Sequence, residues 1–258
     1  MAADFKYIYG PVFSWRLGSS LGIDLLSGKE KACSFDCIYC QVGKTRFYAI
    51  QRKIYAPTKA VVEEIKKIPK ARIDYITFSG RGEPTLAKNL GEVIRSVKRL
   101  RKERIAVLTN SSLMNREDVR EELALADFVI AKLDASSEEI FGPVNKPAGG
   151  IGFKSILSGM KKFRKSYNGR FGLQVMFMDE NKKDAAKIAE LARAIDPDEV
   201  QLNTPLRPCG IKPLSRKEMD EVRSEFRGIN TVSAYDVRSR KVVPISGEAV
   251  LKRRPETC

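Results

Sequence analysis

Short apolar segments alternate with longer segments of helical periodicity along most of this 258-residue chain. In the longer segments, apolar residues recur three and four positions apart, as on one face of a helix. The six expected strands are Leu21–Leu25, Ile73–Phe78, Ile105–Leu108, Phe128–Leu133, Phe171–Phe177 and Val200–Leu202. Such alternation implies an α/β fold of parallel strands joined by helical crossovers, in either an open sheet or a barrel.

Polar residues and glycines mark several expected helix ends. Thr58 and Asn115 are expected to cap the helices that follow them. The segment Ser215-Arg216-Lys217-Glu218 is a capping box that begins the last clear helix, and Gly228 is expected to end it. The helices therefore begin and end between the expected strands, as crossovers require.

The length of the chain suits one α/β domain, or one domain with a small appendage. We expect the main unit over residues 1–228, including an N-terminal lid or edge segment, and a C-terminal extension over residues 229–258. No apolar run approaches the length of a membrane span and no signal-peptide pattern opens the sequence, so no membrane partner is expected. Because closely spaced thiols also favour a reducing compartment, we expect a cytoplasmic protein.

Three of the five cysteines lie within eight residues, Cys33-Ser34-Phe35-Asp36-Cys37-Ile38-Tyr39-Cys40, after the first expected strand. Disulfides cannot fully pair an odd triplet, and Cys209 and Cys258 are isolated in the sequence. A structural zinc site usually needs four Cys or His ligands, and the chain has no histidine. Thiolates are the standard ligands of iron–sulfur clusters, and three thiolates on a cube of four irons leave one iron open. We favour an iron–sulfur site, with zinc or incidental thiols as the alternatives.

The absence of histidine excludes several classes of enzyme. Ser-His-Asp hydrolysis, Cys-His nucleophile pairs and H-E-x-x-H metal sites are all impossible here. Acid–base chemistry would need carboxylates, Lys, Tyr, Cys or water. Cys209 follows the sixth expected strand, where it either faces an active site or is simply buried.

The chain is strongly basic, with 47 Lys and Arg against 32 Asp and Glu and a net charge of +15. Such a charge attracts polyanions. Basic residues concentrate in residues 95–104 and 161–170. These stretches are either solvated helix faces or a surface for RNA.

Polar residues follow the later strands, and parallel α/β folds carry their chemistry at the carboxyl ends of strands. The second strand runs into a turn with the sequence Gly80-Arg81-Gly82-Glu83. Lys132 and Asp134 share one face at the end of the fourth strand, as ligand-binding residues or as a buried ion pair. The other candidates are Asn110 and Ser111, which could bind ribose or carboxylate, and Gln174 and Asn203, which are ligands or satisfied core amides.

The cysteine spacing, with Tyr39 directly before the third cysteine, resembles the signature of the radical S-adenosylmethionine superfamily. This resemblance implies a partial, TIM-like (βα)6 barrel. It also implies that Cys33, Cys37 and Cys40 hold a 4Fe–4S cluster, with S-adenosylmethionine on the fourth iron. Reductive cleavage then yields a 5′-deoxyadenosyl radical that abstracts hydrogen from a substrate. An electron donor such as a ferredoxin or flavodoxin is implied as a partner.

The resemblance also assigns roles to candidate residues. Tyr39 would pack on the adenine. A Gly-Gly-Glu segment of the family binds the amino group of S-adenosylmethionine, and Gly82 and Glu83 match it here, with Arg81 in place of the first glycine. Basic and acidic pairs like Lys132 and Asp134 bind carboxylate and ribose in family members.

Further segments resemble the branch grouped with archaeal wyosine-type tRNA base synthases. They are Tyr9–Val12, Arg16–Gly18, Lys132–Ala135 and Gln201–Pro205. With the positive charge, this likeness makes tRNA the leading expected substrate and a peptide or small metabolite the runner-up. The rival from another class is a zinc- or cluster-stabilised RNA-binding protein without catalysis. Residues 248–254 resemble the start of a small helical domain carried by some relatives, here absent or shortened.

Overall fold

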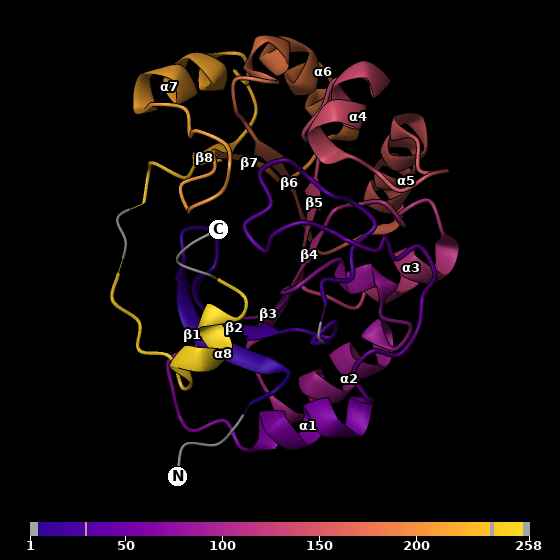
Figure 1. Cartoon of the computed structure of the whole chain (residues 1–258), viewed down its shortest axis with the longest axis vertical. Helices are drawn as coiled ribbons and strands as arrows, with labels where there is room; N and C mark the ends of the chain where they lie inside the picture. The colour runs from indigo at the N-terminus through magenta and orange to yellow at the C-terminus, as the bar shows by residue number, and fades with distance from the viewer. Residues whose placement is uncertain (1–4, 29, 238–239, 255–258) are drawn as a thin grey trace.

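Eight strands form one curved sheet in the order β1-β2-β3-β4-β5-β6-β7-β8 in the computed structural model, which describes residues 5–28, 30–237 and 240–254. The strands are β1 Ile8–Ser14, β2 Gly18–Ile23, β3 Tyr75–Phe78, β4 Arg104–Thr109, β5 Phe128–Lys132, β6 Arg170–Met176, β7 Glu199–Asn203 and β8 Thr231–Ser233. β1 pairs antiparallel with β2, and all the other pairs are parallel. β1 and β8 are the two edges of the sheet and do not pair with each other. The curved sheet is therefore an open half-barrel (Figure 1).

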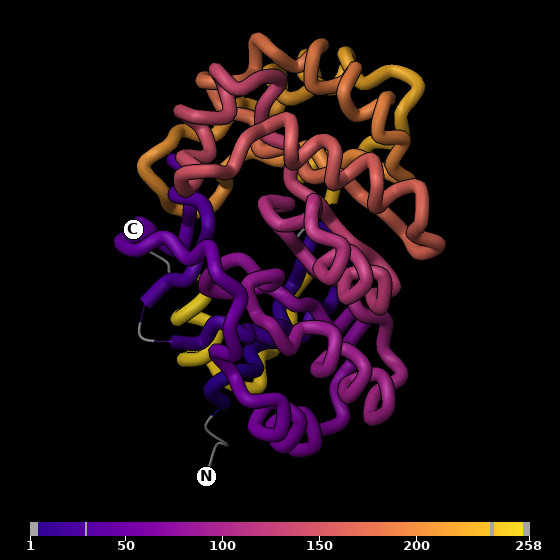
Figure 2. Tube along the Cα trace, turned by 90° about the vertical axis from the view of Figure 1, so that its right-hand side faces the viewer, coloured from indigo at the N-terminus to yellow at the C-terminus, as the bar shows by residue number. Residues whose placement is uncertain are grey.

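Helices cover the outer side of this sheet, as Figure 1 shows for α2 to α6. The helices are α1 Thr58–Lys66, α2 Leu90–Leu100, α3 Glu117–Leu123, α4 Glu138–Asn145, α5 Phe153–Ser166, α6 Ala185–Ile195, α7 Arg216–Ser224 and α8 Gly247–Leu251, with 3-10 turns η1 Pro84–Leu86 and η2 Lys182–Asp184. The C-terminal α8 lies beside the N-terminal strands in both views (Figure 1; Figure 2). Within the described residues, no helix combines the length and apolarity needed to cross a bilayer.

Alternate residues of each strand face the helices or the inside of the half-barrel. In β5, Val129 and Ala131 join the main core beneath the helices. Phe128 and Ile130 belong instead to a separate cluster that includes Leu17, from the turn between β1 and β2. Leu17 therefore fills the inside of the half-barrel near the amino ends of the strands.

All six strands expected from the sequence are present, with ends that differ by no more than three residues. β1 forms within the expected lid or edge segment and occupies a sheet edge. The three-residue β8 was not predicted, and it joins the sheet although it follows residue 228. It is too short to give a recognisable apolar pattern.

Two of the three expected helix caps are wrong. Thr58 is the first residue of α1, after Pro57, and its hydroxyl accepts a hydrogen bond from Asn89 Nδ2 at 3.0 Å. Helix α3 begins after Arg116, and Asn115 does not cap it. In both places the chain enters the helix one residue away from the position that the side-chain chemistry favours.

The capping box of α7 is confirmed. Glu218 N donates to Ser215 Oγ at 3.3 Å, and Ser215 N donates to Glu218 Oε2 at 2.8 Å. Turns lead from the end of this helix to Gly228, whose φ is +82°. This positive φ fits the expectation that a glycine ends the segment.

We expect Ser215→Ala to lower the free energy of unfolding by about 1 kcal/mol, because it leaves an amide of the first turn of α7 without its acceptor. The melting temperature should fall by about 2 °C. Ser224→Ala is the matched control, because Ser224 is exposed in the last turn of the same helix. Equal melting temperatures for the two variants would contradict the capping role.

Candidate functional site

The cysteine loop, residues 33–40, follows β2 and lies across the carboxyl ends of the parallel strands. Main-chain hydrogen bonds join its start to the turn after β3: Ala32 N donates to Arg81 O at 3.2 Å and Glu83 N donates to Ala32 O at 3.1 Å. Its middle is bonded to the end of α4, where Asp36 N donates to Asn145 O at 3.2 Å. The loop is therefore held between two segments that follow different strands.

Gly82 permits the first of these contacts. A Cβ at this position would lie 1.7 Å from Ala32 O, so no other residue fits without displacing the cysteine loop. Gly80 is similarly confined, because a Cβ there would lie 2.3 Å from Asp24 Cγ. Both glycines of the predicted Gly80–Glu83 segment are thus needed for close packing at the base of the loop.

Cys33, Cys37 and Cys40 are free, partly exposed thiols, and each accepts a contact from a nitrogen donor. The donors are Lys31 Nζ to Cys40 Sγ at 3.1 Å, Asn145 Nδ2 to Cys37 Sγ at 3.5 Å and Asn110 Nδ2 to Cys33 Sγ at 3.7 Å. N–H groups directed at sulfur stabilise thiolates and orient them as ligands. This donor set therefore fits thiolate ligation of an iron–sulfur cluster.

Within the described residues, no three His, Cys, Asp or Glu side chains are grouped to hold a single metal ion. A zinc ion would need its thiolates about 2.3 Å from one common centre. The cysteines of a cluster are bound to different irons and do not need to converge in this way. The spread of the three thiols is therefore compatible with a cluster.

Burial governs the protonation of two of these thiols. Burial, followed by the neighbouring Cys37, raises the pKa of Cys33 to about 12. Burial also raises the pKa of Cys37 to about 11, although the charge of Lys132 opposes this. Both groups are therefore neutral thiols at pH 7 without metal, and their ligation of iron must release protons.

Glu83 is buried and satisfied by the protein itself. Its carboxylate accepts hydrogen bonds from Thr85 N at 3.1 Å, Thr85 Oγ1 at 2.7 Å, Thr109 Oγ1 at 2.7 Å and Asn110 N at 2.6 Å. Burial raises the pKa of Glu83, against the effect of these bonds. The side chain therefore ties the turn after β3 to the end of β4, and it leaves main-chain groups of this turn for a ligand.

Lys132 and Asp134 share a face as expected, with Nζ 3.6 Å from Oδ2. Asp134 is buried and also accepts hydrogen bonds from Asn145 Nδ2 at 2.9 Å, Met176 N at 2.8 Å and the Tyr39 hydroxyl. Lys132 Nζ lies over the Tyr39 ring, 4.6 Å from its centroid. The structure thus brings Tyr39, Lys132 and Asp134 together, with the carboxylate already satisfied by protein groups.

The remaining predicted residues lie at the same end of the half-barrel. Ser111 Oγ donates to Lys132 O at 3.2 Å, and the guanidinium of Arg81 donates to Gly28 O at 3.1 Å. Gln174 is buried in β6, in register with Lys132 of β5. Asn203 ends β7 and lines a cavity of about 500 Å³. Their roles as cofactor ligands stay predictions.

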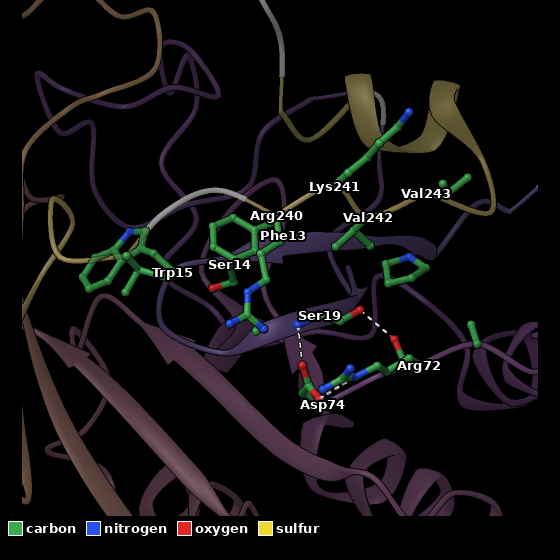
Figure 3. A pocket seen from close by; sticks show the side chains of 14 residues that line it. Phe13, Ser14, Trp15, Ser19, Arg72, Asp74, Arg240, Lys241, Val242 and Val243 are labelled. Atoms are coloured by element: carbon green, nitrogen blue, oxygen red, sulfur yellow. Dashed lines mark hydrogen bonds and ion pairs between the residues drawn. The ribbon is translucent and has the colours of Figure 1, made fainter.

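A second cavity, of about 490 Å³, lies elsewhere (Figure 3). Its walls are the β1–β2 hairpin, residues just before β3 and the segment 240–243. Ser19 N donates to Asp74 Oδ2 at 2.8 Å on one wall, at the amino ends of β2 and β3. No residue of the cysteine loop lines this cavity, so it is separate from the candidate site.

Comparison with known proteins decides the family. The family model described as Radical SAM superfamily matches residues 31–192, which include the cysteine loop and the ends of four parallel strands. The chain belongs to the radical SAM superfamily. This membership implies an iron–sulfur cluster and S-adenosylmethionine, and it supports an enzyme whose reaction is unassigned.

Individual relatives and solved structures show what this radical SAM protein is similar to. The UPF0026 protein slr1464 of Synechocystis is 41% identical over 239 residues, which are 92% of this chain and 86% of the relative, so the chain also belongs with the UPF0026 proteins. A probable GTP 3′,8-cyclase of Saccharolobus solfataricus is 28% identical, over 84% of this chain and 68% of the relative. The structure of TYW1 with a lysine-pyruvate adduct bound superimposes with a TM-score of 0.65 at 17% identity, covering 82% of this chain and 74% of that one. At that identity the likeness shows the fold alone.

Two groups beside the cysteines of this radical SAM protein were not predicted. Lys31 donates to Gly43 O at 2.8 Å as well as to Cys40. Asn145 follows the cysteines by more than a hundred residues. The one sequence signal for Lys31 was its position two residues before the first cysteine. The sequence alone does not show which way this side chain points.

We expect Lys31→Met to make the reduction potential of the bound cluster more negative by about 50–150 mV, because a positive charge near Cys40 favours the reduced state. Lys44→Met is the matched control: it removes the same charge from an exposed position nearby. An EPR-monitored redox titration measures both. Equal potentials for the two variants would contradict a role for Lys31 at the cluster.

Proposed function

We propose that this protein is an enzyme that reductively cleaves S-adenosylmethionine at a 4Fe–4S cluster held by Cys33, Cys37 and Cys40. The observation that carries the proposal is the loop of three free cysteines, each contacted by an N–H donor, in a chain of the radical SAM superfamily. When bound, the cluster would supply one electron to the sulfonium, which would give methionine and a 5′-deoxyadenosyl radical able to take hydrogen from a substrate. The electron would come from a ferredoxin or flavodoxin.

The chain's own residues hold the loop in place for this chemistry. Asn110 donates to Ser34 Oγ at 3.0 Å as well as to Cys33, so one amide links the end of β4 to the loop. Asn145 links Cys37 to Asp134. The main chain of Gly82 and Glu83, held by the buried Glu83 side chain, would orient the methionine end of the cofactor. Lys132 lies over the ring of the buried Tyr39, and we expect this pair to support the nucleoside part of the cofactor.

The two basic stretches give little support to an RNA substrate. Residues 95–104 run from α2 to the start of β4, and residues 161–170 run from α5 to the start of β6. Both therefore lie at the amino ends of strands, opposite the cysteine loop. Some of their charges are also paired, as in the ion pair of Lys98 with Asp127 at 2.7 Å. RNA bound there would be far from the cluster.

We therefore propose a small metabolite as the substrate, ahead of tRNA. The relative named probable GTP 3′,8-cyclase supports a small substrate. The likeness to wyosine-type tRNA base synthases favours tRNA, but it rests on short segments of sequence. If tRNA is the substrate, its binding should be tight at low salt and weaken steeply as salt rises. A salt dependence no steeper than that of a neutral polymer would contradict the tRNA proposal.

The proposed function is tested by anaerobic reconstitution with iron and sulfide. A dithionite-reduced sample should convert S-adenosylmethionine to methionine and 5′-deoxyadenosine in equal amounts, measured by liquid chromatography. Stoichiometric zinc and no cleavage after reconstitution would overturn the proposal and favour the non-catalytic RNA-binding alternative.

A further inference from the structure

Three arginines from distant parts of the chain line one cavity beside the cysteine loop. The cavity of about 500 Å³ has Arg16 from the β1–β2 turn, Arg207 after β7 and Arg254 after α8 in its wall. Gln41, directly after Cys40, and Asn203 also line it. Gln41 Nε2 donates to Arg207 O at 3.4 Å, so this wall is continuous with the cysteine loop.

None of these guanidinium groups forms an ion pair with a described carboxylate. Burial, followed by the charges of Arg207 and Arg254, lowers the pKa of Arg16 to about 9. Arg207 is an exposed residue overall, but partial burial of its guanidinium in the cavity wall, with the charge of Arg254, lowers its pKa to about 10. Guanidinium groups stay charged in proteins, and those of Arg207 and Arg254 repel that of Arg16. Glu199, whose charge opposes this effect on Arg16, is itself engaged by Arg170.

Two buried polar atoms have no hydrogen-bond partner among the described residues, and the first of them belongs to this wall. They are Arg16 Nε, a donor, and Gln201 Oε1, an acceptor. Gln201 is only 1% exposed and lies on the same face of β7 as Asn203, two residues before it. Buried polar groups are almost always hydrogen-bonded, so Arg16 Nε is available to donate to a ligand in this cavity.

We propose that this cavity binds the phosphate group of a small second substrate, with Arg16, Arg207 and Arg254 as its binding residues. Guanidinium groups bind phosphate oxygens in pairs of parallel hydrogen bonds. Three unpaired positive charges match a doubly or multiply charged phosphate better than the single carboxylate of S-adenosylmethionine. The volume lies within the range of small-molecule sites. Because the cavity lies beside Gln41, a substrate bound in it would be next to the cluster. This assignment as a substrate site rests on the proposed function.

The test is calorimetric titration of the full-length protein with inorganic pyrophosphate at fixed ionic strength. Arg207→Gln and Arg254→Gln should each weaken binding at least about tenfold, because each removes a charged pair of hydrogen bonds. Arg207→Lys should bind with intermediate affinity, because it keeps the charge and loses the paired geometry. The matched control is Arg227→Gln, at an exposed arginine outside the cavity, and it should bind like the wild type.

Several results would overturn the inference. They are no pyrophosphate binding by the wild type, equal weakening in the Arg227 control, and tighter binding of malonate than of pyrophosphate, which would assign the site to carboxylates. Thermal melts of each variant show whether it is folded, and Arg207 is exposed enough to be replaced without loss of the core. Cleavage of S-adenosylmethionine by the wild type is measured separately. Its failure would overturn the proposed function and leave the pyrophosphate result standing.

Discussion

Cys37→Ala is expected to lose the bound iron and sulfide and to lower dithionite-driven cleavage of S-adenosylmethionine at least about 100-fold. Two thiolates remain in this variant, and they would leave two irons of a cubane without protein ligands. The fold should persist, because Cys37 is partly exposed and its loop is held by main-chain bonds to the turn after β3 and to α4. Iron and sulfide content, visible absorbance and product analysis measure the effect, and circular dichroism measures the fold.

Cys209→Ala is the informative control for this experiment. Cys209 packs against the small apolar cluster that contains Tyr39, and Cys37 packs against the same cluster. Among the described cysteines outside the loop, Cys209 is therefore the candidate for a fourth iron ligand. Its Sγ donates to Ile211 O at 3.6 Å, so its thiol is already engaged. We expect this variant to keep its iron and its activity. Loss of the cluster in Cys209→Ala would show that the fourth iron is closed by protein, and the open position would be wrong. Cys258 lies outside the described residues.

The strands were predictable where both faces are buried, because such strands need apolar residues at successive positions. This is the case for β3 to β7, each of which lies between the inside of the half-barrel and a layer of helices. β1 escaped prediction because Gly10 and Pro11 interrupt its apolar pattern, and it tolerates them at the edge of the sheet. Helix α4 escaped because Pro143 lies inside it. Local sequence patterns therefore do not predict an element at a sheet edge, or one that contains a residue unusual for its type.

The candidate site was predictable only as far as strand ends and cysteine spacing reach. These features place Cys33, Asn110 and Lys132 at one end of the half-barrel. They carry no information on pairs that meet across more than a hundred residues, such as Cys37 with Asn145. The arginines of the proposed phosphate site meet because a turn between two strands and the last described residue converge on the open side of the sheet. The periodicity of apolar residues in the sequence does not predict such a long-range contact.

The largest expected loss of stability comes from Arg253, which fastens the C-terminal segment to the base of the cysteine loop. Its guanidinium is buried, and its partners are Asp24 Oδ2 at 3.0 Å, Ala249 O at 3.1 Å, Lys6 O and Ser27 Oγ. Asp24 is 1% exposed and also accepts from Leu26 N at 3.1 Å, in the turn that leaves β2. A buried carboxylate that loses its cation is left uncompensated, and such a loss costs about 3–5 kcal/mol.

Arg253→Met should therefore lower the free energy of unfolding by about 3–5 kcal/mol in urea denaturation. Adding Asp24→Asn should restore at least about 1 kcal/mol, because it removes the unpaired charge while keeping an acceptor for Leu26. Lys252→Met is the matched control: it breaks only the exposed pair with Glu248 at 2.7 Å and should leave the free energy of unfolding close to that of the wild type. A loss below 1 kcal/mol in Arg253→Met would show that the C-terminal segment is not needed to hold the turn. Because that turn leads directly into the cysteine loop, the same variant should also take up less iron than the Lys252 control.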